Sequence, residues 1–328
     1  MTPIPTVIVT SSPLTMSRLG RELGSLPEIS LCGQAGDLSG AYILVERARP
    51  RLVILGQELT RHPDFSGLLA MFRVMEIAWL QIGSGDGADG APFLDPSLSG
   101  PAMLPALHAS LARPAETLPP RPPAPAPTVR ARPDRLILIG SSTGGIDALL
   151  HVLSAFPPDC PPTAIVQHTG AAFSDSLIRL LDRCCAAQVL PAQSGAPLRP
   201  GHVIVGAGCG GHMRLQPGSP PQVLVTPGPA VSGHVPSVDE MFRSALPIAQ
   251  RVAAALLTGM GRDGAAGMLD LRRAGAATIA QDEATSVVYG MPRAAWENGG
   301  AQCRLPIARI GPELLARCAD RPPEMAGR

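Results

Sequence analysis

The segment Leu138-Ile139-Gly140-Ser141-Ser142-Thr143-Gly144-Gly145 decides the fold, because it joins an apolar strand to a helix through a glycine-rich turn. Residues 140–144 match the Gly-x-Ser-x-Gly pattern of a nucleophile elbow, in which a tight turn exposes the serine hydroxyl beside a helix N-terminus. Two other interpretations stay open on this segment alone. Ser142 or Thr143 caps the helix, or the loop holds a nucleotide phosphate.

Short apolar runs alternate with helix-period segments on both sides of this turn. Upstream, the runs TVIVT, ISLCG, RLVILG and AWLQIGS alternate with SRLGRELGSL and SGAYILVERA. Downstream, the runs TAIVQH, HVIVGAG, QVLVTPG, AAALLTG and AATIAQD occur with the helix-like segments IDALLHVLSAF, FSDSLIRLLDR and GAAGMLDLRR. This alternation predicts an α/β fold of repeated βα units around parallel sheets.

The proline-rich segment 113–133, RPAETLPPRPPAPAPTVRARP, divides the chain of 328 residues. It has almost no large apolar side chains, so it cannot form a core, and we expect an extended linker. The sequence therefore predicts a first domain at residues 1–112 and a second, doubly wound and mainly parallel α/β domain at residues 134–328. Two domains also fit the chain length, at about 150 residues per domain.

Composition excludes several classes of function. All 27 basic residues are arginine, and they nearly balance 26 acidic residues, so the formal charge is +1. With aromatic residues at 3%, neither a nucleic-acid partner nor an anionic membrane is expected. Because lysine is absent, the Walker A motif, the pyridoxal Schiff base and the Ser-x-x-Lys dyad are excluded.

The cysteines and the hydropathy pattern exclude further features. Seven cysteines contain no Cys-x-x-Cys pair, which argues against a zinc site or a disulfide framework. We therefore expect no metal and no cofactor. No apolar run approaches the length of about 18 residues that a membrane-spanning helix needs, and the N-terminus does not resemble a signal peptide. These features predict a cytoplasmic protein without membrane insertion.

A histidine stands where a nucleotide-binding sheet would carry an acid. The strand 163–168, TAIVQH, ends in His168, and Gly-x-Gly-x-x-Gly is absent, so a dinucleotide-dependent oxidoreductase is disfavoured. The carboxyl ends of neighbouring parallel strands meet at one edge, so Ser142 and His168 should lie on the same rim. A lone histidine here would more often be structural, whereas beside an elbow serine it is a candidate general base.

A carboxylate and an oxyanion donor complete the predicted site. Asp263 follows a strand and the turn Gly259-Met260-Gly261, and it could orient the imidazole of His168. Capping of the following helix is the alternative role for Asp263. The Met260 N–H, between two glycines, is a candidate oxyanion donor. The chain order of Ser142, His168 and Asp263 differs from that of the common hydrolase folds, but triads are defined by geometry.

Several motifs together resemble the chemotaxis protein-glutamate methylesterases, the CheB family. The resemblance covers residues 136–315 and lies in the segments Gly140–Gly145, Gln167-His168, Pro236–Asp239, Leu257–Gly264, Gln281–Glu283 and Tyr289–Arg293. It implies a serine-type ester hydrolase that removes γ-methyl groups from chemoreceptor glutamates, releases methanol and in many members deamidates glutamines. The family triad falls on Ser142, His168 and Asp263, and the oxyanion and substrate-binding positions fall on Met260 and Thr143.

The chain departs from the family pattern around the predicted cleft. Thr169-Gly170 replaces Met-Pro, Gly208 replaces a proline, and Val235 replaces an arginine. These changes put receptor specificity in doubt more than the chemistry. We expect His212, which matches a family histidine, to be structural, and we assign no role to the other three histidines of this domain: His151, His202 and His234.

The first domain resembles a receiver, a flavodoxin-like (βα)5 module, that has lost its switch. Ser11 and Ser12 stand at the acidic pair, Gly56 at the phosphoacceptor aspartate and Asp95 at the conserved lysine. Without the carboxylates there is neither a hard-cation site nor a phosphoryl acceptor. We therefore expect a degenerate receiver that aspartyl phosphorylation cannot switch.

The resemblance implies methyl-accepting chemoreceptors as substrates, with proteins of the chemosensory array or other regulators as partners of the first domain. The competing interpretation is a catalytically silent chemotaxis adaptor that keeps the fold. Erosion of the first domain favours the adaptor, but the intact motifs of the second domain favour the enzyme. Methanol release from methylated receptor distinguishes the two.

Overall fold

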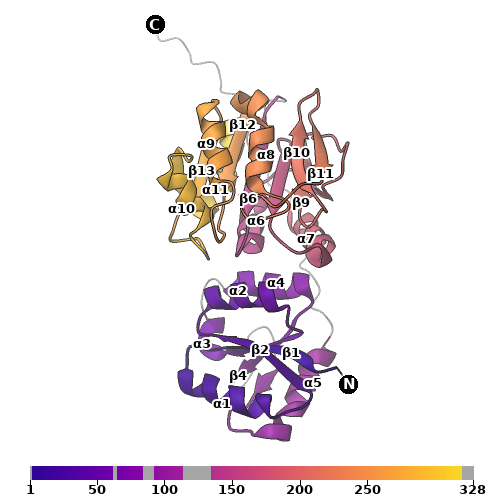
Figure 1. Ribbon diagram of the computed structural model, residues 1–328, viewed down its shortest axis with the longest axis vertical. Helices are drawn as coiled ribbons and strands as arrows, with labels where there is room; N and C mark the ends of the chain where they lie inside the picture. The colour runs from indigo at the N-terminus through magenta and orange to yellow at the C-terminus, as the bar shows by residue number, and fades with distance from the viewer. Residues whose placement is uncertain (1, 62–64, 84–91, 114–133, 320–328) are drawn as a thin grey trace. The chain divides into compact units, whose positions relative to one another are not determined.

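The computed structural model describes residues 2–61, 65–83, 92–113 and 134–319 (Figure 1). Contacts divide the chain into two compact units, residues 1–118 and 119–328, and each is described by itself. Most of the predicted linker, residues 114–133, lies outside the described part. Among the described residues, no helix combines the length and apolar character that crossing a membrane requires.

The first unit is a five-stranded parallel sheet in the order β2-β1-β3-β4-β5. This order is the flavodoxin-like one, which confirms the predicted (βα)5 architecture. Helices α1 and α5 cover one face of the sheet and α2 and α4 cover the other, while the short α3 follows β3 (Figure 1). The elements are β1 (Ile4–Val9), α1 (Pro13–Gly24), β2 (Ile29–Ala35), α2 (Leu38–Ala48), β3 (Leu52–Gly56), α3 (Gln57–Thr60), α4 (Phe65–Met75), β4 (Ala78–Ile82), β5 (Phe93–Leu94), the 3-10 turn Gly100–Met103 and α5 (Leu104–Ala112).

Local sequence explains how α1 begins and which face it buries. The Ser12 hydroxyl accepts a hydrogen bond from the Thr15 N–H, and Pro13 occupies the first turn, where its missing N–H costs nothing. Leu19 and Leu23 are four residues apart and therefore share one face of the helix. Both are fully buried against the sheet, together with residues of α5.

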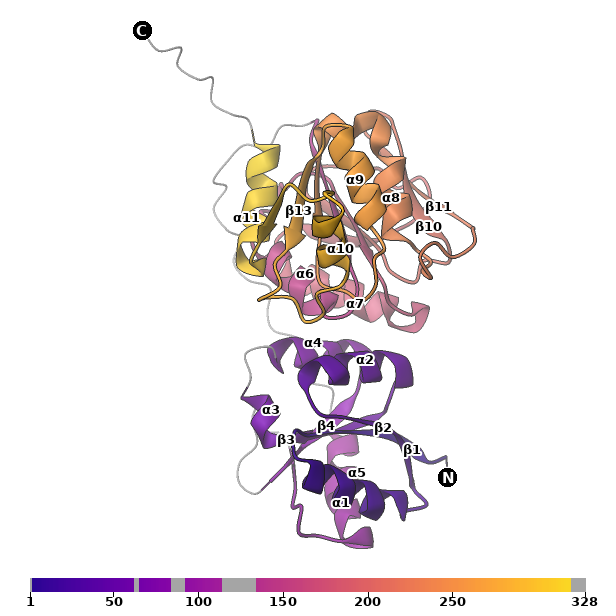
Figure 2. The same cartoon turned by 60° about the vertical axis from the view of Figure 1, so that its left-hand side comes forward.

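The second unit is a seven-stranded sheet in the order β14-β13-β12-β6-β7-β9-β8, and every strand pair in it is parallel. Helix α6 contacts both α7 and α11 on one face, and α8, α9 and α10 pack on the other with a small hairpin (Figures 1 and 2). The elements are β6 (Leu136–Ser141), α6 (Gly145–Ser154), β7 (Thr163–Gln167), α7 (Ala171–Cys184), β8 (Gln188–Pro191), β9 (His202–Gly206), β10 (His212–Gln216), β11 (Gln222–Thr226), α8 (Val238–Ser244), the 3-10 turn Leu246–Arg251, β12 (Val252–Leu256), α9 (Ala265–Arg273), β13 (Ala277–Gln281), α10 (Met291–Glu297), β14 (Cys303–Leu305) and α11 (Ile307–Cys318).

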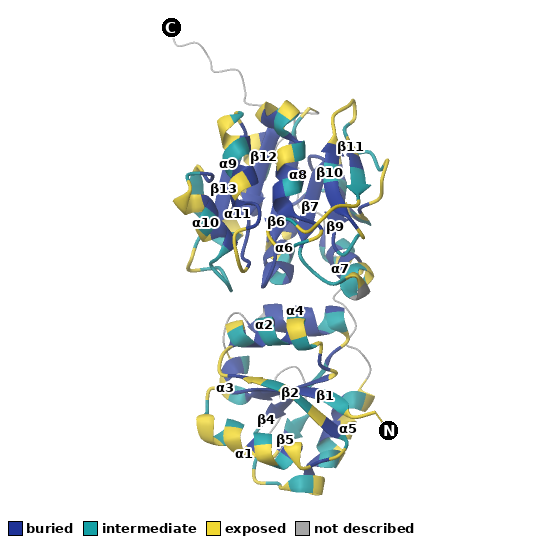
Figure 3. Ribbon diagram, in the orientation of Figure 1, coloured by how far each residue is buried: buried dark blue, intermediate teal, exposed yellow. Residues whose placement is uncertain are grey.

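The central strands of this sheet are buried on both faces, as their continuous apolar sequences predict (Figure 3). Leu136 and Leu138 of β6 belong to a core that also holds Phe242 of α8 and Met268 of α9. From β6 the chain builds β7, β8 and β9 on one side and β12, β13 and β14 on the other. This reversal makes the carboxyl end of β6 the switch point of the sheet, where open α/β folds bind ligands.

One apolar run of the second unit lies outside the parallel sheet. The run QVLVTPG forms β11, but this strand pairs antiparallel with β10 in a separate two-stranded sheet. Only residues 217–221 separate the two strands. A parallel partner requires a crossover of about a dozen residues or more, so a connection this short permits only a hairpin.

Candidate active site

Three neighbouring strands of the second unit end at the candidate site. Ser141, the last residue of β6, is in register with Gln167, the last residue of β7, and Gly140 is in register with Leu256 at the end of β12. Ser142 and His168 therefore leave the same edge of the sheet from adjacent strands. Asp263 follows β12 beyond a glycine-rich turn. The sequence prediction that these residues share one rim is confirmed.

Backbone hydrogen bonds hold Ser142 in a tight turn. Its carbonyl accepts from the Gly145 N–H at 2.7 Å and from the Gln167 side-chain amide at 3.0 Å, and its own N–H donates to the Thr258 carbonyl at 3.0 Å. Gly144 is left-handed, with φ of 77°, and it occupies the N-cap position of α6 without a side-chain hydrogen bond. The alternative that Ser142 or Thr143 caps this helix is therefore wrong.

The imidazole of His168 binds the carboxylate of Asp263. His168 Nε2 lies 2.9 Å from Asp263 Oδ2, and the carboxylate is fully buried. An ionised carboxylate only accepts hydrogen bonds, so Nε2 carries a proton, and in the neutral ring Nδ1 has a free lone pair. Nδ1 is buried and has no hydrogen-bond partner among the described residues. It is therefore the ring nitrogen that remains able to accept a hydrogen bond from a hydroxyl group.

No hydrogen bond joins the Ser142 hydroxyl to His168 within the described part of the chain. The His168 N–H instead donates to the Ser141 carbonyl at 3.1 Å, which anchors the histidine backbone beside the serine turn. In unliganded enzymes such contacts are often long and tighten only with substrate bound. The geometry thus shows one of the two hydrogen bonds of a triad directly, the imidazole–carboxylate bond, and places the elbow serine on the neighbouring strand end.

The first turn of α8 fixes the Asp263 carboxylate. Oδ1 accepts from the Ser237 hydroxyl at 2.8 Å and from the N–H groups of Asp239 and Gly264 at 3.1 and 3.0 Å. Oδ2 accepts from the Val238 N–H at 2.8 Å in addition to His168. Burial raises the pKa of Asp263, but the His168 hydrogen bond and charge and the donors of Val238 and Ser237 outweigh it, so the pKa lies below its usual value.

Asp263 does not cap the helix that follows it. Gly264, with φ of 84°, is the N-cap residue of α9 and makes no side-chain cap bond. The alternative assignment of Asp263 as the N-cap of this helix is wrong, because its carboxylate turns to the N–H groups of α8 instead. The carboxylate is therefore a rigid, ionised group aimed at one nitrogen of His168.

The turn after β12 brings a backbone donor next to Ser142. A side chain at Gly259 would collide with Ser142 Cβ, so the two backbones approach closely only because this residue is glycine. The Gly259 carbonyl accepts from the N–H groups of Gly290 and Met291 at 3.1 and 2.9 Å, which fixes the turn. The Met260 N–H has no hydrogen-bond partner among the described residues, and its side chain is 50% exposed. Thr143 is buried, and its carbonyl accepts from the Thr258 hydroxyl at 2.9 Å.

Sequence reasoning missed the contacts of two side chains that support this arrangement, His234 and Gln167. His234, to which no role was assigned, stacks on His168 with 3.7 Å between ring centroids and 6° between ring planes. Gln167 bridges the Ser141 hydroxyl to the carbonyls of Ser142 and His168. Its position just before His168 was visible, but its contacts depend on the tertiary fold.

His212 is structural, as expected. It is buried, its Nε2 donates to the Pro229 carbonyl at 2.8 Å, and its Nδ1 accepts from the Ser237 N–H at 3.1 Å. These two bonds require the neutral ring with the proton on Nε2. His212 thereby anchors the backbone of Ser237, whose hydroxyl binds Asp263.

A glycine stands at the end of β3, where the sequence places the phosphoacceptor position of a receiver. Gly56 ends β3 at the predicted acceptor position, and the carboxylate of Glu58 occupies the space where a Gly56 side chain would begin. Glu58 Oε1 accepts from the Thr10 hydroxyl and the Ser11 N–H, both at 2.8 Å. Asp95 accepts from the N–H and hydroxyl of Ser97.

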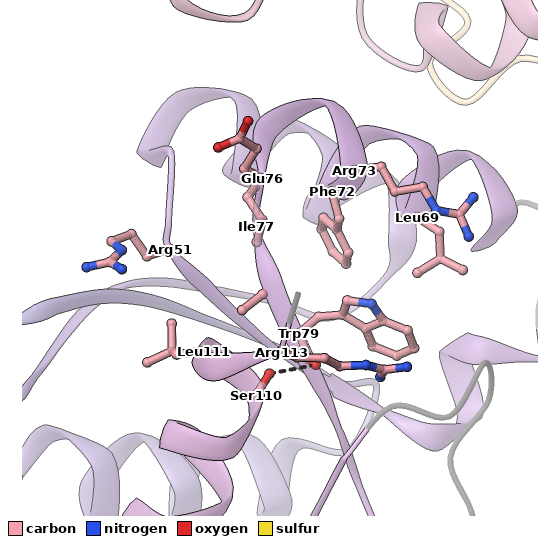
Figure 4. Close-up of a pocket in the computed structure, with 11 residues that line it drawn as sticks. Arg51, Leu69, Phe72, Arg73, Glu76, Ile77, Trp79, Ser110, Leu111 and Arg113 are labelled. Atoms are coloured by element: carbon pink, nitrogen blue, oxygen red, sulfur yellow. Dashed lines mark hydrogen bonds between the residues drawn. The ribbon is translucent and has the colours of Figure 1, made fainter. Parts of the chain in front are cut away.

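A cavity of about 140 Å³ lies in the first unit between α4, β4 and α5 (Figure 4). Phe72 and Trp79 form apolar walls, and the side chains of Arg51, Arg73 and Arg113 line it. Its lining residues include no histidine to act as a base for the Ser110 hydroxyl, which donates to the Trp79 carbonyl at 2.9 Å. The candidate chemistry therefore belongs to the second unit.

An elbow serine, an imidazole bonded to a buried carboxylate and a doubly wound sheet together are typical of serine hydrolases. The family model described as CheB methylesterase matches residues 137–314. The chain belongs to the CheB methylesterase family, which confirms the resemblance found from its motifs.

Relatives that align with nearly the whole chain support this family assignment. The chain is 36% identical to a protein-glutamate methylesterase/protein-glutamine glutaminase of Agrobacterium fabrum, covering 94% of this chain and 95% of the relative. It is 37% identical to a protein of the same description from Rhizobium etli, covering 97% and 98%. The crystal structure of the Thermotoga maritima CheB methylesterase catalytic domain is similar, with a TM-score of 0.54, 32% identity and coverage of 56% of this chain and 97% of that one.

Proposed function

We propose that this protein is a protein-glutamate methylesterase that hydrolyses glutamate γ-methyl esters on chemoreceptors. Ser142 is the nucleophile, His168 the general base and acid, and Asp263 the group that orients and stabilises the imidazole. The observation that carries the proposal is the 2.9 Å bond from His168 Nε2 to buried Asp263, which leaves Nδ1 unpartnered at the edge where Ser142 emerges.

The first half of the reaction forms a glutamyl-enzyme. The Ser142 hydroxyl attacks the ester carbonyl, and its proton passes to His168 Nδ1. The Asp263 carboxylate stabilises the imidazolium through the Nε2–H bond. The Met260 N–H, with Thr143 beside the nucleophile, stabilises the negative oxygen of the tetrahedral intermediate. The intermediate collapses as Nδ1–H protonates the methoxide, and methanol leaves.

Water completes the cycle. His168 Nδ1 takes a proton from the water that attacks the glutamyl ester, and it returns this proton to the Ser142 oxygen as the acyl bond breaks. The products are a glutamate carboxylate and the free serine. A glutamine side chain follows the same route with ammonia as the leaving group. Glutamine deamidation is therefore a second activity that the site supports, and the relatives' descriptions name it.

Replacement of the nucleophile tests the catalytic assignment. Methanol release from methylated receptor is measured for the full-length protein, for Ser142→Ala and for Ser154→Ala, an exposed serine at the end of α6. We expect Ser142→Ala to lose at least about 10⁴-fold in kcat, because a triad without its nucleophile keeps only binding and oxyanion effects. Ser154→Ala should match the wild type. Substantial activity in Ser142→Ala would refute the nucleophile, and an inactive wild type would favour the silent adaptor.

We also propose that aspartyl phosphorylation does not switch the first unit, which in this respect is a degenerate receiver. Support comes from Gly56 at the acceptor position, Ser11 and Ser12 at the acidic pair, and the Glu58 carboxylate that fills the space beside Gly56. A Mg²⁺ site needs several oxygen ligands, chiefly carboxylates, and phosphoryl transfer needs a free one. Incubation with acetyl phosphate and Mg²⁺ should leave the intact mass unchanged. Stoichiometric phosphorylation would contradict this proposal.

The partners we propose are methyl-accepting chemoreceptors as substrates and proteins of the chemosensory array through the first unit, all in the cytoplasm. The family's activity on receptor glutamates supports the first of these partners. Sedimentation of full-length protein with receptor-containing membranes tests both. The Ser142→Ala variant should sediment as the wild type does, because docking does not require turnover. Absence from the membrane fraction with and without array proteins would oppose the proposed partners.

A further inference from the structure

His234 contacts the proposed base from a loop distant in sequence. It lies in the segment between β11 and α8, whereas His168 follows β7. The two imidazoles stack nearly parallel, with 3.7 Å between centroids and an interplanar angle of 6°. The ring nitrogens of His234 have no hydrogen-bond partner in the part of the chain that is described. The stack on His168 is therefore the specific contact of this half-buried ring.

The loop that carries His234 is fixed on both sides of the ring. Val231 and His234 exchange backbone hydrogen bonds of 3.0 and 3.2 Å around a turn in which Gly233 has φ of 85°. Three residues later, Ser237 binds His212 through its N–H and Asp263 through its hydroxyl. The network that holds the Asp263 carboxylate thus also fixes the end of the His234 loop. The stacked ring is held in place before substrate binds.

We infer that His234 is a positioning residue, which holds the plane of the His168 ring so that Nδ1 faces the nucleophile and supports the imidazolium that forms there. This inference rests on the proposed function. The bond to Asp263 fixes one atom of His168, but rotation about that bond would still swing Nδ1 away. A flat surface 3.7 Å above the ring opposes that rotation. When His168 takes the serine proton, the neutral face of His234 also provides a cation–π contact.

The charges around His234 favour the neutral form that this role requires. Burial lowers the pKa of His234, the neighbouring His168 charge lowers it further, and only the Asp263 carboxylate opposes them. These are the two titratable groups that act on His234 among the described residues. Two stacked imidazolium ions would repel each other, so the stack favours a neutral His234 beside a protonated His168. The nitrogen lone pairs of two stacked rings lie in two parallel planes and do not converge on one point. The contact between His168 and His234 is therefore ring packing and not the binding of a shared metal ion.

Three variants of the full-length protein separate positioning from mere packing. His234→Phe keeps an aromatic surface but cannot titrate, His234→Ala removes the surface, and His151→Ala is a matched control on the exposed face of α6. Methanol release from methylated receptor is measured from low to neutral pH. We expect His234→Ala to lose about 100-fold in kcat with KM nearly unchanged, as for a misplaced catalytic group. His234→Phe should stay within about tenfold of the wild type, because a phenyl ring keeps the stacking face.

The pH profile provides the readout that a merely structural role would not change. In the wild type, a proton on His234 places a charge against the face of the His168 ring, so methanol release at low pH should depend on the charge state of His234. In His234→Phe this dependence should be absent. Equal kcat in His234→Ala and wild type, or identical pH profiles in His234→Phe and wild type, would overturn the inference.

A second measurement separates this inference from the proposed function. Imidazole resonances of the free protein, followed by NMR against pH, should show the pKa of His234 below its ordinary value in the wild type and closer to that value in His168→Phe, because burial and the neighbouring His168 both lower it. This result does not depend on the substrate. If the wild type released no methanol but His168 still lowered the pKa of His234, the proposed function would be wrong and the stacked pair would be supported. A His234 pKa that did not respond to the replacement of His168 would refute the stacked pair.

Discussion

Each unit of the molecule places a carboxylate at the carboxyl edge of a parallel sheet, and the two carboxylates differ in what they face. Glu58 follows β3 in the first unit, and Asp263 follows β12 in the second. Burial raises the pKa of each, but hydrogen-bond donors outweigh burial and lower it overall. Asp263 shares Oδ2 with the imidazole of His168, whereas Glu58 faces the hydroxyl of Thr10 and the backbone and hydroxyl of Ser11.

The comparison shows that the fold places a carboxylate at the edge of each sheet, and that the side chain in contact with the carboxylate decides which chemistry is possible there. An imidazole can accept a proton near neutral pH and pass it on, but a threonine or serine hydroxyl cannot. In the second unit the glycine at position 259 keeps the space beside Ser142 open, and in the first unit Glu58 fills the space beside Gly56. The same fold class thus supports a reactive edge in one unit and a closed edge in the other.

Among changes at the two sheet edges compared above, the largest expected effect comes from removing the charge of Asp263. In Asp263→Asn the side chain keeps its shape but no longer stabilises the imidazolium or fixes the His168 tautomer. We expect kcat for methanol release to fall by about 10⁴-fold, the size seen for the corresponding change in a serine protease. Asp270→Asn, at an exposed ion pair with Arg243, is the control. A loss of less than tenfold in kcat for Asp263→Asn would show that the Asp263 carboxylate does not support the imidazole of His168, and the proposed difference between Asp263 and Glu58 would be wrong.

The pH dependence of the Asp263 contribution has a definite sign. The pKa of Asp263 in the folded protein is lowered from 3.8, so its ionised carboxylate stabilises the folded state. This contribution to the free energy of unfolding is fully present above the pKa of the unfolded chain and is lost as pH falls through the pKa of the folded protein. At neutral pH the carboxylate is therefore always ionised. An acidic limb in the pH profile above about pH 5 therefore does not belong to Asp263.

Sequence reasoning reached the residues that follow strands, because strand ends can be located from apolar runs and parallel strands share an edge. Ser142, His168 and Asp263 all belong to this group. It missed His234 because the loop before α8 has neither periodicity nor a strand end to place it. It left the partner of β11 open, because an apolar run does not reveal its partner, although the short connection from β10 does.

Glu58 shows the same limit in the first unit. The resemblance directs attention to Gly56, where an acceptor is missing, and not to a carboxylate two residues later. Its long side chain can turn back to the strand edge, and only coordinates show that it does so. Position 56 therefore has no acidic side chain of its own, and the Glu58 carboxylate occupies the space where that side chain would begin.

A moderate effect is expected from Glu58→Gln. The partly exposed carboxylate binds the Ser11 N–H, and replacing its charge should weaken this bond by about 1 kcal/mol, near the lower limit for a charged acceptor because solvent screens it. The Ser11 amide should then exchange its hydrogen about fivefold faster at neutral pH, if local opening controls exchange. The folded pKa of Glu58 is lowered from 4.5, so this difference should vanish as pH falls through the folded value. Glu313→Gln is the control, and an unchanged Ser11 amide in Glu58→Gln would show that the edge is not held by this charge.

The smallest effect is expected from Gly56→Ala. The backbone of Gly56 has φ of −65° and ψ of 137°, which alanine adopts without strain, but a Cβ there would overlap the Glu58 carboxylate. The flexible carboxylate can swing aside, and the reduced freedom of the unfolded chain offsets the loss by about 0.4–1 kcal/mol. We expect a net destabilisation of the first unit below about 1 kcal/mol. In a Glu58→Ala background, where nothing occupies the space, the same change should be neutral or stabilising in denaturant unfolding. An equal cost in both backgrounds would mean that the two residues do not compete for this space, because a double-mutant cycle isolates their interaction.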